Sequence, residues 1–231
     1  MRPPLALVRW NDLEGGVCWL HGSRLAGVIT ARRCSEVLPA LVEVERATQK
    51  GLSAIGFVAY EAAHGFDRAF PEAQTGLPLV WFALVDLAVL KDEREVLQAH
   101  LAEVPSCGLA HESWSPTLTR RDYQRALKRI RDYIAAGDVY QVNYSFRLRA
   151  PFAGDPFALF WERYHAQPVP YAAYIDAGEH VILSLSPELF LALDGESVVS
   201  RPMKGTAPRG LLLEDDIQQA QALRWSEKNR A

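Results

Sequence analysis

Residues 181–201 read VILSLSPELFLALDGESVVSR and contain three short apolar runs, which are separated by Pro187 and by the pair Asp194-Gly195. Short apolar runs with such boundaries are typical of β-strands. An Asp-Gly pair between two strand-like runs predicts a tight hairpin. We therefore predict antiparallel strand pairing in this region, with strands near 180–185, 189–193 and 197–201.

The residues before this region combine helices with a strand. Thr119 and Asp122 have the spacing of a capping box, and apolar residues then recur at helical spacing until Gly137, which predicts a helix over 120–136. Asp155-Pro156 is typical of a helix start. We expect that second helix to end near 166, a strand near 171–176, and a further helix from Glu214.

Between these two helices, the period changes to two. Apolar residues from Tyr140 to Leu148 alternate with polar residues from Gln141 to Arg149, which predicts a strand with one polar face. That face could line a functional site. It could equally be the wet side of an antiparallel sheet, which is the commoner case.

The first half of the chain is predicted to mix strands with one clear helix. Helical spacing begins after a predicted cap at Ser35 and includes Val37 to Glu45, while 53–60 and 79–85 are typical of strands. The polar stretch 106–115 has no periodicity. We therefore predict two domains, 1–115 and 116–231, in an α+β fold with large antiparallel β-sheets and flanking helices.

Composition limits the class of protein. The 231 residues are 49% hydrophobic, enough for a packed core, and the net charge of -3 gives no reason to expect nucleic acid or an anionic membrane as a partner. Cys18, Cys34 and Cys107 form neither a disulfide framework nor a zinc motif. With no secretory signal or spanning segment in the sequence, we expect a soluble, cytoplasmic protein.

The strongest chemical signal is Lys204, which lies between Arg201 and Arg209 in a stretch rich in proline and glycine. Nearby positive charge favours the neutral, nucleophilic form of an amine. Glu188 precedes Lys204 by 204 − 188 = 16 positions, and the predicted hairpin pairs Glu188 with Arg201, close to Lys204. The alternative is an ordinary solvated lysine and an exposed carboxylate at a strand start.

Other motifs are weak. His64 and His165 have no partner at metal-ligand spacing, and we assign them no ligand role. The glycines form neither a dinucleotide fingerprint nor a P-loop.

Three stretches together resemble the chorismate-utilising enzymes, a family that includes anthranilate synthase component I, aminodeoxychorismate synthase component I, isochorismate synthase and salicylate synthase. They are 134–145, 184–190 and 201–210, in the order and spacing of the family. The resemblance is close over about 119–231 and looser before it. It implies the fold of anthranilate synthase component I, of which this chain would be the N-terminal portion.

Within the family, lysine at the position of Lys204 is similar to aminodeoxychorismate synthases, whereas anthranilate synthases typically carry alanine there. The resemblance implies that Lys204 attacks C2 of chorismate and that Glu188 is the general acid/base. It further implies substrate contacts from the residues Ser186, Gly205, Thr206 and Arg209. A glutamine amidotransferase would supply ammonia for 4-aminobenzoate and folate synthesis.

In the family, Mg²⁺ binds glutamates well beyond residue 231, so we expect no metal ligands in this chain and no activity from the chain alone. Two alternatives stay open. One is an anthranilate synthase or another chorismate-converting synthase. The other is a catalytically incomplete fragment or a subunit-binding module.

Overall fold

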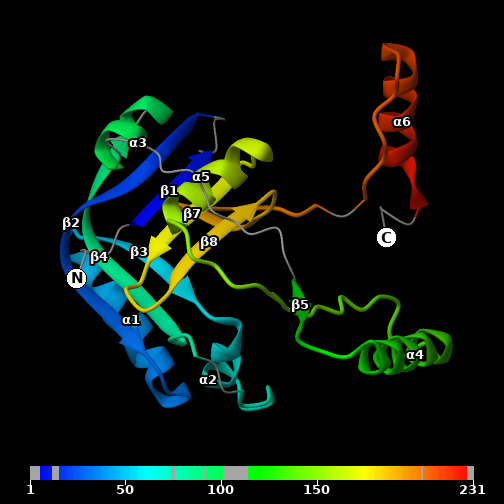
Figure 1. The fold of residues 1–231 in the computed structure, drawn as a ribbon, viewed down its shortest axis with the longest axis horizontal. Coiled ribbons are helices and arrows are strands. Elements are labelled where there is room, and N and C mark those ends of the chain that lie inside the picture. The colour runs from blue at the N-terminus through cyan, green and yellow to red at the C-terminus, as the bar shows by residue number, and fades with distance from the viewer. Residues whose placement is uncertain are drawn as a thin grey trace. The chain divides into compact units, whose positions relative to one another are not determined.

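The computed structural model describes residues 6–11, 16–73, 76–90, 92–100, 114–203 and 205–227. Its main feature is a six-stranded antiparallel sheet in the order β3-β4-β2-β1-β7-β8 (Figure 1). The sheet strands are β1 (Ala6–Asn11), β2 (Val17–Ala31), β3 (Ser53–Val58), β4 (Val80–Leu90), β7 (Tyr171–Asp176) and β8 (Val181–Ser186). The predicted antiparallel α+β class is thereby confirmed.

Strand β4 continues five residues beyond the predicted end at Val85. It does so because β2, whose bounds were not predicted, pairs with it from Trp19 opposite Leu90 to Ala31 opposite Val80. The register of this pair shifts twice, between Gly22 and Arg24 and between Leu25 and Gly27. Such irregularities bend and twist a strand pair locally.

The predicted first helix is present as α1 (Val37–Gln49), after a short 3-10 turn, η1 (Cys34–Glu36). The predicted cap at Ser35 is wrong, because Ser35 lies inside η1. The Glu36 carboxylate instead accepts the amides of Arg32 and Arg33, each at 3.0 Å. Helix α1 packs in a buried cluster with residues of the sheet and of the turn that follows β3: Ile29, Ala31, Ala62, Leu79 and Val80. That turn is η2 (Tyr60–Ala62), followed by α2 (Ala63–Phe66).

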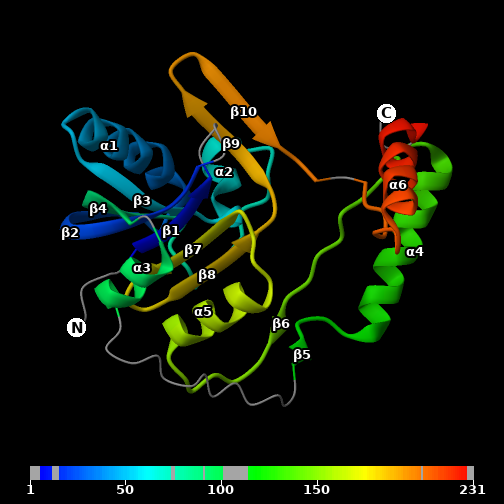
Figure 2. The same cartoon turned by 90° about the horizontal axis from the view of Figure 1, so that it is seen from above.

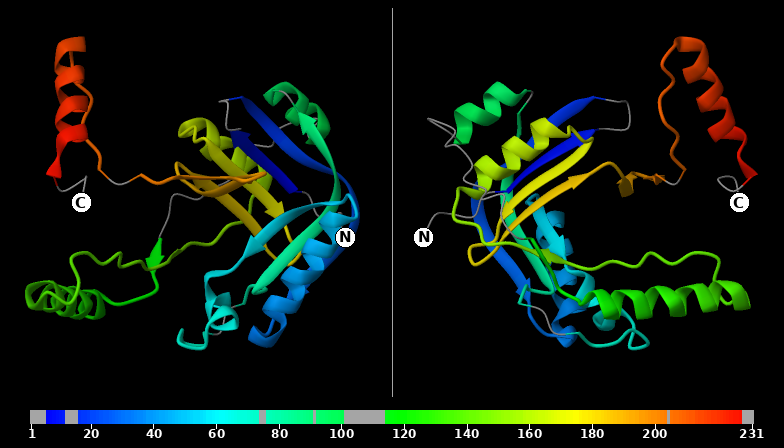
Figure 3. Two further views of the ribbon diagram at one scale, coloured as in Figure 1. Left: turned by 180° about the vertical axis from the view of Figure 1, so that it is seen from behind. Right: turned by 45° about the vertical axis from the view of Figure 1, so that its right-hand side comes forward.

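The predicted helix from Asp155-Pro156 is confirmed as α5 (Pro156–Ala166), which is drawn in yellow-green in Figure 3. Its aromatic residues Phe160, Trp161 and Tyr164 surround Trp19 of β2, with ring centroids 5.2–6.4 Å apart. A short helix, α3 (Glu93–His100), follows β4. The Glu93 carboxylate of α3 contacts His165 of α5 at 3.1 Å.

Strands β9 (Leu189–Asp194) and β10 (Ser197–Arg201) form the predicted hairpin, drawn in orange in Figure 2. The predicted register is wrong by one residue at Arg201, which pairs with Leu189 and not with Glu188. Gly195 takes a left-handed φ of 57°, and the loop is Gly195-Glu196, so Asp194 belongs to β9 and pairs with Ser197, not to the predicted turn. A bulge between Val199 and Arg201 then shifts the end of the ladder.

The structure confirms α4 (Arg120–Ala136), which is capped by Thr119 and ends at Gly137 with φ 81°. The predicted strand over 140–149 is wrong for most of its length. Only β6 (Leu148–Arg149) pairs, with β5 (Ser115–Pro116). In the rest of this segment, the aromatic residues Tyr144 and Phe146 pack on Tyr123 of α4. Their backbone forms no β-ladder, because the described chain contains no longer strand that could pair with it.

The chain divides into two compact units, Met1–Val104 with Phe160–Ala231, and Pro105–Leu159. The six-stranded sheet takes strands from both sides of the predicted boundary at 115/116; that division into two domains stays a prediction. The last helix, α6 (Leu213–Trp225), has no buried residue among those described. No described helix is long and apolar enough to cross a membrane.

Candidate functional site

Glu188 lies in the two-residue link between β8 and β9. The Ser186 hydroxyl holds this link, because its Oγ accepts the Glu188 amide at 3.1 Å and donates to the Glu188 carbonyl at 3.0 Å. The structure thus brings together two of the predicted site residues, Ser186 and Glu188. Ser186 contacts the backbone of Glu188 and leaves its carboxylate free for other contacts.

The Glu188 carboxylate connects this link to the end of the hairpin. Its Oε1 accepts the Met203 amide at 2.7 Å. Met203 is the covalent neighbour of Lys204, which itself lies outside the described residues. The carboxylate is exposed, as a group must be if it is to exchange protons with a substrate. The carboxylate of Glu188, the predicted acid/base, therefore accepts a hydrogen bond from Met203, the residue before the predicted nucleophile Lys204.

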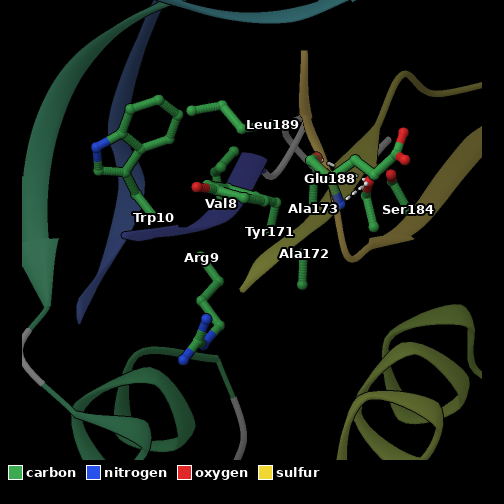
Figure 4. Close-up of a pocket in the computed structure, with 10 residues that line it drawn as sticks. Val8, Arg9, Trp10, Tyr171, Ala172, Ala173, Ser184, Glu188 and Leu189 are labelled. Atoms are coloured by element: carbon green, nitrogen blue, oxygen red, sulfur yellow. Dashed lines mark hydrogen bonds between the residues drawn. The ribbon is translucent and has the colours of Figure 1, made fainter. Parts of the chain in front are cut away.

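A pocket of about 150 Å³ opens beside Glu188 (Figure 4). The residues that line it come from the four strands β1, β7, β8 and β9 and from the link itself, and include Val8, Trp10, Tyr171, Ser184, Ser186 and Glu188. The ring of Trp10 meets the ring of Tyr171 edge-on, with centroids 6.0 Å apart. Hydroxyl groups, one carboxylate and aromatic faces can together receive a small ring that carries polar groups.

Arg9 also lines this pocket, and in Figure 4 its side chain extends from β1 in the direction opposite to that of Trp10. Its Nη1 donates to the carbonyl groups of Val169 and Pro170, at 2.9 and 2.8 Å. Arg9 therefore ties β1 to the segment before β7. Its Nε is buried and has no hydrogen-bond partner among the described residues.

Sequence reasoning missed Trp10, Tyr171 and Ser184 as residues of the site. They lie far apart in sequence and meet only because β1 pairs with β7, with Arg9 opposite Ala172, and β7 pairs with β8. The period-two spacing of Tyr171 and Ala173, and of Ser184 and Ser186, was a usable signal, since alternate strand residues share one face.

Arg201 connects the hairpin to this pocket. Its Nη1 donates to the Tyr171 hydroxyl at 3.3 Å. Among the described residues, no carboxylate forms an ion pair with Arg201. Its positive charge thus stays uncompensated by the described chain, three positions before Lys204.

Arg209 is engaged differently from Arg201. Its Nε and Nη2 contact the two carboxylate oxygens of Asp216, at 2.7 and 2.6 Å. The Gly210 amide donates to the same carboxylate at 3.0 Å. This amide and, after it, the Arg209 guanidinium hold the pKa of Asp216 below its ordinary range.

The remaining predicted substrate contacts are Gly205, which is half-buried, and Thr206, which is exposed. No hydrogen bond between described residues links Gly205, Thr206 or Arg209 to Glu188. Their predicted role in binding substrate stays a prediction.

The described residues contain no cluster of side chains typical of a metal site. Magnesium in proteins is bound by one or two carboxylates together with other oxygen ligands. Nowhere in the described part of the chain do three or more His, Cys, Asp or Glu side chains converge. We derive no chemical step through a metal ion from this chain.

Comparison with known proteins gives consistent matches. Residues 24–231 match the family described as chorismate binding enzyme. The chain is 45% identical over 113 residues to anthranilate synthase component 1 of Thermus thermophilus, covering 49% of this chain and 24% of that protein. It is 32% identical over 196 residues to aminodeoxychorismate synthase component 1 of Klebsiella aerogenes, covering 77% of this chain and 44% of that protein.

Among solved structures, anthranilate synthase component I from Streptococcus pneumoniae TIGR4 superposes with a TM-score of 0.61 and 20% sequence identity. The match covers 99% of this chain and 57% of that chain. At this identity the likeness shows the fold alone, which is the predicted one. The chain spans less than half the length of the two curated relatives named above.

Proposed function

The chain belongs to the family of chorismate binding enzymes, and on that premise we propose that it is part of an aminodeoxychorismate synthase component I. The observation that carries the proposal is the hydrogen bond from the Met203 amide to Glu188 Oε1, at 2.7 Å. It joins the residue before Lys204 to a carboxylate in one local site. A relative with the proposed activity, from Klebsiella aerogenes, aligns with 77% of the chain.

The proposed reaction replaces the C4 hydroxyl of chorismate by an amino group in two displacements. The neutral amine of Lys204 forms a bond to C2 while the C4 hydroxyl leaves, and Glu188 gives it the proton with which it departs as water. The nitrogen loses its extra proton to the carboxylate thus formed. Ammonia then bonds to C4 as the C2–N bond breaks, and the proton that the new C4 ammonium gives up passes to the departing nitrogen, which restores the neutral amine of Lys204. The net change is chorismate plus ammonia to 4-amino-4-deoxychorismate plus water.

The residues around Glu188 suit this role. Ser186 fixes the backbone on which the carboxylate stands, so little reorganisation is needed when a proton moves. The charge of Arg201, which forms no ion pair with a described carboxylate, favours an anionic substrate and a neutral amine nearby. The pocket beside Glu188 supplies aromatic and hydroxyl surface for a ring.

We further propose that ammonia comes from a glutamine amidotransferase partner. The matched relatives are named component 1, a name that supports a second subunit. We also propose that the complete protein binds Mg²⁺ through residues outside 1–231.

A second candidate is anthranilate synthase component I. The 45% identity to the Thermus thermophilus protein favours it. The two activities differ in where nitrogen is added, at C4 for aminodeoxychorismate and at C2 for anthranilate. Lys204 favours the first candidate, because a covalent amine at C2 blocks ammonia from that carbon.

Growth complementation separates these candidates. The gene is expressed in a bacterium that lacks aminodeoxychorismate synthase component 1 and in one that lacks anthranilate synthase component 1. The proposal predicts growth without 4-aminobenzoate in the first strain and no growth without tryptophan in the second. The opposite pattern would replace the proposal by the second candidate.

In both strains, growth with the 231-residue chain is compared with growth with the longest protein that the same gene encodes. We expect the 231-residue chain by itself to support growth in neither strain. Liquid chromatography with mass spectrometry on chorismate, ammonium and Mg²⁺ mixtures then identifies the product. If no product of the gene acts on chorismate, the alternative of a subunit-binding module stands.

A further inference from the structure

The C-terminal end of the segment 205–210 is held by one carboxylate, that of Asp216. Asp216, in the first turn of α6, binds both nitrogens on one edge of Arg209 and also the Gly210 amide. Bidentate contacts between guanidinium and carboxylate fix the geometry of both groups. The Asp216 side chain keeps only 25% of its exposure, whereas that of Arg209 keeps 89%. The carboxylate is therefore the anchored partner and the arginine is oriented by it.

Gly210 shows how close this approach is. A Cβ added to it would lie 2.1 Å from the Asp216 backbone nitrogen and 2.5 Å from the carbonyl carbon of Asp215. No side chain is compatible with such distances to backbone atoms. The backbone at residue 210 is thus packed directly against the first turn of α6, independently of the hydrogen bonds.

The N-terminal end of the same segment is also held. The Met203 amide bonds to Glu188, and Arg201 donates to the Tyr171 hydroxyl. Contacts to the sheet and to α6 therefore flank the segment that contains the predicted substrate contacts Gly205 and Thr206.

We propose that Asp216 is a positioning residue that closes the 205–210 segment on α6 and aims Arg209 at the substrate. The Nε and Nη2 edge of Arg209 is taken up by Asp216, and no described hydrogen bond uses Nη1. Because a guanidinium carries five N–H donors, the remaining edge can bind a carboxylate of an anionic substrate. The substrate part of this inference rests on the proposed function.

The first test needs no chorismate. A lysine-specific endoproteinase cleaves the Lys204–Gly205 bond, and the Lys50–Gly51 bond in the same molecule serves as a reference. Local opening controls the rate of such cleavage, so we expect Asp216→Ala to accelerate cleavage after Lys204 by about tenfold, with no change after Lys50. Asp216→Asn keeps an oxygen that can accept the Gly210 amide, so its rate of cleavage after Lys204 should lie between the rates of the parental protein and of Asp216→Ala.

The matched control is Asp215→Asn, which makes the same charge change one residue away, in the same helical turn. In the Asp215→Asn variant, the endoproteinase should cleave after Lys204 at the same rate as in the parental protein. Equal rates for Asp216→Ala and Asp215→Asn would overturn the proposal. This result does not depend on the reaction catalysed, so it stands even if the proposed function fails.

The second test uses the form of the enzyme that turns over chorismate. Asp216→Ala and Arg209→Ala should each raise the KM for chorismate by about tenfold and lower kcat less, and the double variant should do no more than either. A merely structural role would lower kcat with KM unchanged, and that outcome would refute the positioning of Arg209. Asp216→Asn should raise the KM for chorismate less than Asp216→Ala does.

Discussion

Lys204 is the residue on which the proposed reaction depends, since its amine forms the bond to C2. We expect Lys204→Ala to abolish formation of 4-amino-4-deoxychorismate, because no other group supplies the covalent amine. Intact mass after incubation with chorismate should show an adduct on the parental protein and none on the variant. Borohydride is not a useful trap, because the adduct is a secondary amine.

The control for this experiment is Lys128→Ala, which removes an exposed lysine from α4. It should retain both the adduct and the activity. Undiminished formation of aminodeoxychorismate by Lys204→Ala would exclude the covalent mechanism.

Glu188 combines a proposed chemical role with an observed structural one. Glu188→Gln keeps an oxygen that can accept the Met203 amide but cannot transfer the proton. We expect kcat to fall by about 10²–10⁴-fold, the usual contribution of a general acid or base. The measurement is steady-state kinetics with ammonium as nitrogen donor.

Glu196→Gln is the matched control for Glu188→Gln, since Glu196 is an exposed carboxylate in the loop of the same hairpin. It should leave kcat unchanged. Parental activity in Glu188→Gln would remove the acid/base role.

Among the elements, α4 owes its start to a capping pair. The Asp122 amide donates to the Thr119 hydroxyl oxygen at 3.1 Å, and that hydroxyl donates to the Asp122 carboxylate at 2.6 Å. The hydroxyl and then Arg125 lower the pKa of Asp122 below its ordinary 3.8. A carboxyl with a lowered folded-state pKa stabilises above its unfolded pKa, and this contribution is lost as pH falls through the folded pKa.

We therefore expect Asp122→Asn to reduce stability at neutral pH. The difference from the parent should shrink as the pH is lowered below about 4. Urea unfolding at a series of pH values, followed by helical circular dichroism, measures this difference. Asp132→Asn, which changes an exposed carboxylate on the same helix, should show no such trend. A difference for Asp122→Asn that grows at acidic pH would contradict the assignment.

The helices were more predictable than the strand pairs. Capping residues and 3.6-residue spacing act within one segment, and so they located α4 and α5 closely. The alternation over 140–149 did not produce a strand, because a ladder needs a partner and the described chain supplies only Ser115–Pro116. The β9–β10 register differed from the prediction because Gly195 and one bulge redefine which residues face each other.

At the level of the whole molecule, the aromatic contact between α5 and the sheet is the clearest part of the core. Phe160 is 0% exposed and contacts Trp19, whereas Phe190 on the hairpin is 90% exposed. We expect Phe160→Ala to lower the free energy of unfolding by about 3–5 kcal/mol. Phe190→Ala, the same change at an exposed site, should alter it by about 0.5 kcal/mol or less.

Urea unfolding followed by tryptophan fluorescence reports this comparison, since Trp19 lies in the contact. Similar losses from both substitutions would show that α5 does not pack on β2 as described.

The sequence by itself determined the family and the local helices, and it suggested the roles proposed for Lys204 and Glu188, because these inferences depend on residue type and short spacing. Only the tertiary structure decided which distant strands pair, and hence that Trp10, Tyr171 and Ser184 meet beside Glu188. It also decided that Arg209 is held by Asp216 while Arg201 is not paired with a carboxylate among the described residues. Such pairings arise from contacts between segments, and residue spacing along the chain does not specify them.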